Sequence, residues 1–560
     1  MRVAAGLATG MLLASLAQAQ TPAVVPTPSQ LTPAAPPTHA ADVLPVPPVP
    51  RELGKPSDEL HVDVDAYTVS PEAPAELRAA LGRLTAPFVG PGRSFEDLVN
   101  AANEVTRFLQ RDLGHYLGYA YIPEQTMDAQ QVRIAVLEGR LDHVVLNWHD
   151  DLPVRREVVQ AYLDRLHPGA ILTVQEVERA VFLVNDLRGI TVRAEVRAGS
   201  QPGTATLVFT PKADARWNGG VDADANGSRF IGADRLGVQL SYNSPLGRGD
   251  GLSASVLGSS TGGLNFALLG YTTPMGGDGF KSGLSVSALE YRLDRTAFPL
   301  GLDGTGLTVN VFGLYPWVRS RNLNLFALGA VNDKAYVDNV ASISNHKRVD
   351  DVTLGLNGDF RDSLLTGGVN TFDLNFSAGQ LSFASGVPSG LDDALNYSKV
   401  NLAYSRLQNL IDGRLLLYLN MRGQWALNNL DTTEQFRAGG TDGVRAFAPG
   451  EGTGDSGGVL SAELRWLPPA NWLGKYSREV VVALFYDSAY VQLRHDPSQV
   501  VRAPDYVNHS TLAGAGLSLV WARPGQYALR ISAAKPTQGQ AKSDTQERSV
   551  RVYAQGSWRF

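Results

Sequence analysis

The segment from residue 454 to 458 is the first candidate for covalent chemistry, because Gly454-Asp455-Ser456-Gly457-Gly458 has the residue types that surround a nucleophilic serine. Such a serine also needs a histidine, an aspartate and an oxyanion hole brought beside it. The chain has no cysteine and no Thr-Ala-Ala-His-Cys segment that would supply the histidine. The sequence therefore predicts that the protein is not an enzyme and that this motif lies where the longest connection enters the twelfth strand-like segment.

Nucleotide, metal and nucleic-acid sites are also disfavoured. The stretch Gly277-Asp278-Gly279-Phe280-Lys281-Ser282 is rich in glycine but lacks the Gly-Lys step of a phosphate-binding loop, so it predicts a turn. The nine histidines include no pair at i, i+4 with an acidic neighbour, a spacing typical of metal sites on helices. The net charge of −6 argues against a nucleic-acid partner. We therefore expect no cofactor and no metal.

Arg445 and Asp487 have the types and the placement of an ion pair. Arg445 lies in the longest connection between strand-like segments, from about residue 425 to 457, and Asp487 lies in the strand-like run Phe485-Tyr486-Asp487-Ser488-Ala489. Alternation places Asp487 on the same face as Glu479. In an enclosed lumen, a bidentate pair would hold the long connection in one position. From the residues alone, an exposed loop arginine without a special partner is the favoured interpretation, and the ion pair is the alternative.

The elements that must position this pair are two-faced strands. At the end of the chain, one residue in two is apolar or small, and the residues between them are mostly polar, which suits lipid on one face and a wet lumen on the other. The apolar face consists of Val550, Val552, Ala554, Gly556, Trp558 and Phe560. From about residue 213 onward, sixteen alternating segments follow one another. They lie near 213–225, 233–243, 250–258, 264–271, 280–291, 307–316, 322–331, 349–360, 367–378, 396–407, 412–424, 457–467, 478–490, 512–522, 526–534 and 548–560.

The connections between these segments alternate between short and long, as they do in outer-membrane barrels. Long connections are predicted after Asn332, Gly379, Ala426 and Val491. An even number of strands puts both ends of the chain on one side of the membrane. The sequence thus predicts a transmembrane β-barrel of sixteen antiparallel strands over residues 213–560, in which the last strand pairs with the first.

The N-terminus has the features of an exported protein. Arg2, an apolar stretch and Ala17-Gln18-Ala19 predict a signal peptide over residues 1–19. Residues 20–59 are rich in proline and predict an extended linker. Because the chain has no cysteine, its stability must come from packing or from a closed sheet rather than from disulfides.

Two units of the same element order fill the space between this linker and the barrel. Residues 60–138 and 139–212 each predict a strand, two helices and two strands. The second helix of each unit starts at a predicted N-cap, with Ser94 followed by Asp97 in the first unit and Thr173 followed by Glu176 in the second.

The two units resemble POTRA domains, and the longest connection resembles the loop-six motif of outer-membrane POTRA-barrel proteins. That motif is usually Val-Arg-Gly-Tyr or Arg-Gly-Phe, and here it reads Gly443-Val444-Arg445-Ala446-Phe447. The run from Phe485 to Ala489 is similar to the family's Phe-x-Asp-x-Gly motif, so the resemblance implies that Arg445 pairs with Asp487. Ala446 and Ala489 depart from the pattern, because the family usually has glycine at both positions.

Nearly all of the mature chain resembles the two-partner secretion transporters of the TpsB family. This resemblance implies an outer-membrane protein that captures an unfolded TpsA-type exoprotein, an adhesin, haemolysin or toxin, through periplasmic POTRA domains. Residues Gly443 to Phe447 would gate the pore, and Trp558 and Phe560 would form the signal read by the barrel-assembly machinery. The implied partners are that exoprotein, outer-membrane lipid and the assembly machinery, and the implied state is a monomer.

Two other functions fit a barrel of this kind. A barrel-assembly insertase of the same superfamily usually has more POTRA units than the two predicted here. A passive porin would have no use for POTRA units or for a buried ion pair.

The family often has an N-terminal helix that plugs the pore, but the prolines between Thr21 and Pro56 exclude a continuous helix there, so we expect loop six or another gate to seal the pore.

Overall fold

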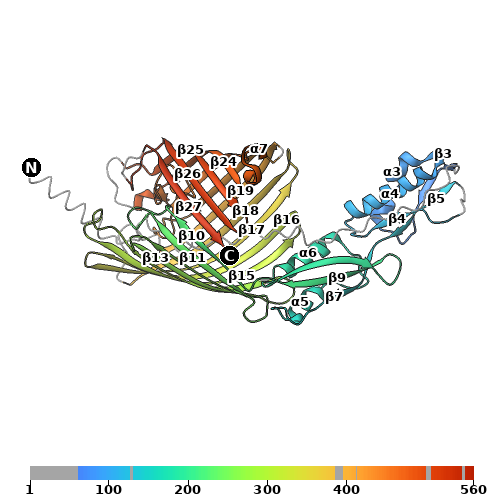
Figure 1. Ribbon diagram of the computed structural model, residues 1–560, viewed down its shortest axis with the longest axis horizontal. Helices are drawn as coiled ribbons and strands as arrows, with labels where there is room; N and C mark the ends of the chain where they lie inside the picture. Colours follow the sequence, from blue (N-terminus) through green and yellow to red (C-terminus); the bar gives the residue numbers. More distant parts are fainter. Residues whose placement is uncertain (1–60, 126–129, 385–394, 412, 500–505, 545–548) are drawn as a thin grey trace, which may run out of the picture.

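A computed structural model describes residues 61–125, 130–384, 395–411, 413–499, 506–544 and 549–560. It consists of two small α+β units that lead to a closed β-barrel (Figure 1). The predicted signal peptide and linker lie outside the described residues. The segment between Thr21 and Pro56, in which we expect no plug helix, also lies outside them.

The first unit packs two helices against short strands. Ser94 Oγ accepts a hydrogen bond from the Asp97 N–H (3.2 Å), and the Asp97 carboxylate accepts one from the Ser94 N–H (2.9 Å), so α4 begins with the predicted capping box. The first predicted strand of this unit is two short strands in the structure, because the chain changes partner at Asp65: β1 pairs with β3 and β2 pairs with β5. The elements are β1 (His61–Val64), β2 (Ala66–Thr68), α3 (Ala75–Thr85), β3 (Gly90–Ser94), α4 (Phe95–Arg111), β4 (Tyr119–Tyr121), β5 (Gln131–Arg133) and β6 (Ala135–Leu137).

The second unit has a three-stranded sheet covered by two helices. Its elements are β7 (Arg140–Leu146), α5 (Arg156–Leu163), α6 (Val174–Asn185), β8 (Ile190–Ala198) and β9 (Thr204–Ala213), in the sheet order β7-β9-β8. Thr173 and Glu176 form the predicted capping box of α6. Val159, Val181 and Phe209 are fully buried between helices and sheet. Among the described residues, no helix combines the length and apolar content needed to cross a membrane.

The barrel in the described residues closes with sixteen antiparallel strands, in the predicted order. The last strand pairs with the first from Asp224 opposite Gln555 to Gly220 opposite Arg559, and Phe560 and Gly219 exchange two backbone hydrogen bonds (2.9 and 3.0 Å), which confirms the predicted closure. The strands are β10 (Trp217–Asp224), β11 (Arg235–Asn243), β12 (Gly251–Ser259), β13 (Leu264–Pro274), β14 (Lys281–Arg292), β15 (Leu302–Arg319), β16 (Leu323–Val340), β17 (Ile343–Asp362), β18 (Gly368–Phe383), β19 (Asn396–Ile411), β20 (Leu415–Ala426), β23 (Ser456–Trp466), β24 (Val480–Gln492), β25 (His509–Arg523), β26 (Tyr527–Gln538) and β27 (Arg551–Arg559).

The prediction of a long connection after Asn332 is wrong. β16 continues to Val340, and only two residues separate it from β17. On the outer face of this extension Arg348 pairs with Asp333 in a two-hydrogen-bond contact (2.7 and 2.9 Å), so polar residues occupy both faces there. Sequence alternation disappears when both faces are polar, although the backbone ladder continues, and this is why the strand ends were placed too early.

The two faces of the barrel wall differ as predicted. Leucine, valine and aromatic side chains on the outside are exposed, including Val552, Trp558 and Phe560 of the last strand. The inner face carries hydrogen-bonded polar side chains such as Asn310, which donates to Asn332 (2.7 Å). The wall is therefore apolar outside and polar inside.

The second α+β unit is joined to one rim of the barrel, where α6 lies beside the end of β15 (Figure 1). Backbone N–H groups of Arg155 and Arg188 donate to Gly247 O (2.9 Å) and Gly249 O (3.0 Å) in the turn between β11 and β12. A Cβ at Gly277 would lie 2.1 Å from Ala161 O of α5, so only glycine allows that close approach. The glycine-rich stretch from 277 is thus a turn between β13 and β14, as predicted.

One buried ion pair adds to this joint. Arg319, at the end of β15, donates to both carboxylate oxygens of Asp186 just after α6 (2.8 and 3.1 Å). Arg319 also donates to Asn324 (2.7 Å), and its guanidinium lies 5.1 Å from the centre of the Phe182 ring. We refer to these contacts between the second unit and the barrel as the periplasmic joint.

Candidate functional site in the barrel lumen

The longest connection, here called loop six (residues 427–455), folds back inside the barrel between β20 and β23. It contains the two-residue strands β21 (Phe436–Arg437) and β22 (Thr453–Gly454), which pair with each other. Most of its side chains are buried. Its apolar members pack against the inner face of β23, β24 and β25 in one cluster: Phe436, Ala438, Val444, Ala446, Phe447, Val459, Phe485, Ala489 and Leu512.

Arg445 is the centre of a dense polar contact with this wall. Its Nε and Nη2 donate to the two oxygens of Asp487 (2.9 and 2.8 Å), and its backbone N–H donates to Asp487 Oδ2 (3.1 Å). Nη1 donates to Glu463 Oε1 (2.7 Å), and Nη2 also donates to Ser461 Oγ (3.0 Å). The guanidinium carbon lies 3.4 Å from the centre of the Phe485 ring.

Burial makes these contacts strong. Arg445 is 5% exposed and Asp487 is 0% exposed. Away from water a planar guanidinium requires carboxylates in matching geometry, and here one carboxylate takes two donors while a second one takes a third. We call this set of contacts the first anchor of loop six.

The other motif residues shape the loop around Arg445. A Cβ at Gly443 would lie 1.8 Å from Ala438 O, so that position accepts only glycine. The Val444 N–H donates to the same oxygen (2.8 Å). Phe447 O accepts a hydrogen bond from Tyr553 Oη of β27 (2.7 Å), which connects the loop to the last strand.

The departure at Ala446 has a structural counterpart. A Cβ added to Gly514 of β25 would lie 2.4 Å from Ala446 Cβ. Because Gly514 of the wall has no side chain, the loop can have alanine at position 446 and still pack closely against β25. Ala489, the other departure, is buried in the same apolar cluster.

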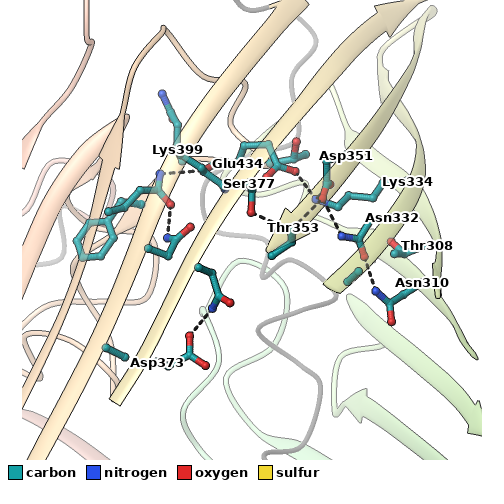
Figure 2. A pocket seen from close by; sticks show the side chains of 18 of the residues that line it. Thr308, Asn310, Asn332, Lys334, Asp351, Thr353, Asp373, Ser377, Lys399 and Glu434 are labelled. Carbon is teal, nitrogen blue, oxygen red and sulfur yellow. Dashed lines mark hydrogen bonds and ion pairs between the residues drawn. The ribbon is translucent and has the colours of Figure 1, made fainter. Parts of the chain in front are cut away.

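The first limb of loop six (residues 427–438) contacts another sector of the wall through charged groups. Glu434 accepts hydrogen bonds from Lys334 of β16 (2.7 Å) and from Lys399 of β19 (2.8 Å). Asp431 lies 3.0 Å from Lys347 Nζ of β17. Glu434, Lys334 and Lys399 line one side of a polar cavity of about 590 Å³ in the lumen (Figure 2).

The return of loop six is held by the other external loops. The Glu451 carboxylate accepts hydrogen bonds from the backbone N–H groups of Lys542 and Ser543 (2.9 Å each) between β26 and β27. Asp455 accepts from the His495 N–H (2.8 Å), and Ser456 Oγ accepts from the Ala426 N–H (3.0 Å). Asp455 and Ser456 thus take part in closing the loop.

Sequence reasoning named Arg445 and Asp487 but missed their neighbours. Ser461 and Glu463 share the inward face of β23, and their alternation with the exposed Leu460 and Leu464 is the signal that could have found them. Nothing in the sequence indicated that Glu434 meets Lys334 and Lys399, because the three residues lie in different segments and share no motif.

The comparison with protein families agrees with this architecture. Residues 203–519, more than half of the chain, match the model described as haemolysin secretion/activation protein ShlB/FhaC/HecB. Residues 67–139 match the POTRA domain of ShlB type. The chain belongs to this family of two-partner secretion transporters. It is therefore an outer-membrane transporter for secretion of exoproteins, and its POTRA units lie in the periplasm.

Curated relatives cover most of the transporter. The transporter is 24% identical over 463 residues to the heme/hemopexin transporter protein HuxB of Haemophilus influenzae. The matched region covers 81% of this chain and 80% of HuxB. It is 26% identical over 411 residues to the outer membrane transporter CdiB of Escherichia coli. The matched region covers 69% of this chain and 66% of CdiB.

Solved structures share the fold. The structure of CdiB from Escherichia coli covers 100% of the transporter and 98% of its own chain, with a TM-score of 0.69 and 20% identity. BamA from Haemophilus ducreyi, lacking POTRA domains 1–3, covers 90% of this chain and 100% of its own, with a TM-score of 0.54 and 14% identity.

Proposed function

We propose that the transporter secretes one unfolded TpsA-type exoprotein through its lumen and that loop six gates this passage. The observation that carries the proposal is the position of loop six, which lies inside the lumen with Arg445 buried against Asp487 and Glu463. A polypeptide that passes through must displace the loop or move beside it. A charged contact suits such a gate, because it holds the loop firmly yet can reform after each passage.

Capture in the periplasm is the first step of this proposal. The sheet order β7-β9-β8 leaves β8 at one edge of the second POTRA unit, and an edge strand can add an extended segment through backbone hydrogen bonds. Because such bonds do not depend on side chains, this mode suits an unfolded client. HuxB is named as a heme/hemopexin transporter, and by analogy we propose a separate secreted adhesin, haemolysin or toxin as the client here.

The remaining assignments follow from the same proposal. Residues 60–138 and 139–212 act as the two POTRA domains, and residues 213–560 act as the pore. The exposed side chains of Trp558 and Phe560, with ring centres 5.6 Å apart, act as the signal for the barrel-assembly machinery. The protein works as a monomer surrounded by outer-membrane lipid.

Crosslinking in cells tests the capture step. The natural chain has no cysteine, so Glu195→Cys places a single thiol on the exposed side of β8. We expect a crosslink from this thiol to the exoprotein, and none from Glu157→Cys, an exposed position on α5 of the same unit. Equal crosslinking from both positions would contradict capture at the β8 edge.

Deletion of the gene tests the exporter against the insertase. An exporter should lose one secreted protein while other outer-membrane barrels keep their normal amounts. Loss of several barrels at once would contradict the proposal and favour an insertase.

A further inference from the structure

The Glu434 side chain occupies a position between two lysines of the lumen wall. Lys334 Nζ donates to Glu434 Oε1 (2.7 Å) and Lys399 Nζ donates to Glu434 Oε2 (2.8 Å), so each oxygen has its own ammonium partner. Lys399 Nζ also donates to the backbone oxygen of Glu434 (2.9 Å), and so does Gln424 Nε2 (2.9 Å). Glu434 itself is 6% exposed.

These partners belong to a different part of the wall from the partners of Arg445. Lys334 and Lys399 come from β16 and β19, whereas Asp487 and Glu463 come from β24 and β23. β17 and β18 lie between the two lysine-bearing strands, so Glu434 bridges across two strands of the barrel. Figure 2 shows Lys399, Glu434, Lys334 and Asp351 following one another along this wall.

The charges of this group balance only when the loop is in place. Lys334 also pairs with Asp351 of β17 (2.8 Å), which gives two lysines and two carboxylates. Among these four groups, Glu434 is the one that the loop contributes. Withdrawal of the loop leaves two ammonium groups with one carboxylate in a partly buried place, and unbalanced charge in such surroundings is costly.

A neighbouring pair in the same limb repeats the arrangement. Lys347 of β17 is 0% exposed in its side chain and lies between Asp431 of the loop (3.0 Å) and Asp338 of the wall (3.2 Å). Here too the loop supplies one carboxylate to a lysine of the wall. Two carboxylates three residues apart thus bind the first limb to lysines on β16, β17 and β19.

The cavity beside Glu434 gives the limb room to move. Its wall carries uncharged polar side chains, among them Asn310, Asn332, Thr353 and Ser377 (Figure 2). When the limb leaves the lysines toward this space, water and polar side chains can take over its hydrogen bonds, while Leu430 and Phe436 of the limb leave their apolar clusters.

We propose that Lys334 and Lys399 form a carboxylate-binding site on the lumen wall and that Glu434 in this site is a second anchor of loop six, independent of Arg445. The inference rests on the proposed gating function, since an anchor matters only if the loop moves. It assigns each limb of the loop its own contact: residues 427–438 through Glu434, and residues 443–448 through Arg445. The two limbs then open separately.

Cysteine labelling of each limb tests the second anchor. Thr433→Cys, at a position 6% exposed, places a thiol on the first limb, and Val444→Cys, at a position 0% exposed, places one on the second. Glu434→Lys should raise the maleimide labelling rate of the first-limb thiol by at least about tenfold, because three ammonium groups then repel one another, while the second-limb thiol stays protected. The full-length protein is labelled in outer-membrane vesicles.

A charge exchange tests direct pairing. Adding Lys399→Glu to Glu434→Lys restores two positive and two negative groups in the same place and should return the first-limb thiol to its slow labelling. Asp333→Asn is the matched control, because Asp333 precedes Lys334 but pairs with Arg348 on the outer face, where the two side chains are 43% and 58% exposed. This control should leave both thiols protected.

The outcomes separate the second anchor from the gating proposal. If Glu434→Lys leaves the first-limb thiol protected while Arg445→Gln exposes the second-limb thiol, the second anchor is wrong and the gate stands. If Arg445→Gln exposes neither thiol while Glu434→Lys exposes the one on the first limb, the second anchor stands and the first one fails. Failure of the exchange to restore protection would overturn direct pairing. Should Glu434→Lys not reach the membrane, Glu434→Gln carries the same test, with a smaller expected increase in labelling.

Discussion

The two ends of the barrel are held by different kinds of contact. On the outer side, loop six packs an apolar cluster against the wall and adds buried charged contacts, with Arg445 against Asp487 and Glu463 and with Glu434 against two lysines. At the periplasmic joint, two backbone hydrogen bonds and glycine turns fit the second unit against the rim, and side-chain hydrogen bonds from Arg179 to Pro316 O (2.9 Å), from Lys281 to Asp186 O (3.0 Å) and from Arg319 to Asp186 (2.8 Å) are added to them.

This difference separates a movable part from a fixed one. A side-chain ion pair can exchange partners without unfolding anything, whereas a close backbone approach depends on the whole shape of both surfaces. We therefore infer that loop six moves during transport while the second POTRA unit stays in place on the barrel.

Arg445→Gln should open the outer end. Removing one partner of a buried ion pair costs about 3–5 kcal/mol, which here falls on the closed position of the loop. Single-channel conductance in planar lipid bilayers should rise sharply. Arg465→Gln is the control, because Arg465 pairs with the same Glu463 (2.7 Å) but does not hold the loop. An equal rise in both variants would show that the loss of charge around Glu463, and not the anchor, opens the pore.

Asp186→Asn should weaken the periplasmic joint without moving it. It leaves Arg319 buried without its carboxylate, at a cost of up to about 3 kcal/mol in the free energy of unfolding, but the backbone contacts remain. Spin labels at Glu157→Cys and Lys475→Cys report the distance between the second unit and the barrel. We expect the same narrow distance distribution with and without the substitution. A broad distribution would mean that the joint depends on charge as much as loop six does.

Gly514→Ala should loosen loop six without removing any charge. The new Cβ would lie 2.4 Å from Ala446 Cβ, and relieving such overlap costs about 1–3 kcal/mol. Conductance should rise less than in Arg445→Gln. Adding Ala446→Gly should return it to the wild-type level, because the glycine then lies on the loop instead of the strand. If the double variant conducts like the single one, the contact between these two residues does not position the loop.

Ser94→Ala should affect neither end of the barrel. Ser94 caps α4 in the first POTRA unit, and loss of such a cap costs about 1 kcal/mol. Backbone and side-chain hydrogen bonds from Ser94 lower the pKa of Asp97, so this cap stabilises the helix above the ordinary aspartate pKa of about 3.9 and is lost as the pH falls through the lowered value. Hydrogen exchange at residues 95–98 should be faster in the variant at neutral pH, with conductance unchanged. A change in conductance would link the first unit to the gate.

Much of the fold could be predicted because its signals are local. Alternation in the last strand, with Val552 and Trp558 on one face, requires only neighbouring residues, and so do the capping boxes at Ser94 and Thr173. The error after Asn332 has the same origin, since alternation carries no information once Asp333 and Arg348 make the outer face polar. Strand order followed because antiparallel neighbours in a barrel are consecutive in the chain.

The site was only partly predictable, because its contacts join residues far apart in sequence. Arg445 and Asp487 could be paired by their resemblance to known motifs. Glu463 was on the inward face by alternation, but which inward carboxylate meets the arginine depends on the register of β23 against β24 and on how deep the loop lies. The pairing of Glu434 with lysines on β16 and β19 depends on the path of the loop across the lumen.

By itself the sequence determined two capped α+β units and sixteen two-faced strands, since each of these is a pattern that repeats within a few residues, and the signal peptide stays a prediction. Only the tertiary structure decided that loop six lies in the lumen, which carboxylates hold it and that the second unit is fixed to the rim. Those features arise when closure of the barrel places distant inward side chains around one enclosed space, where burial selects the pairs whose charges and geometry match.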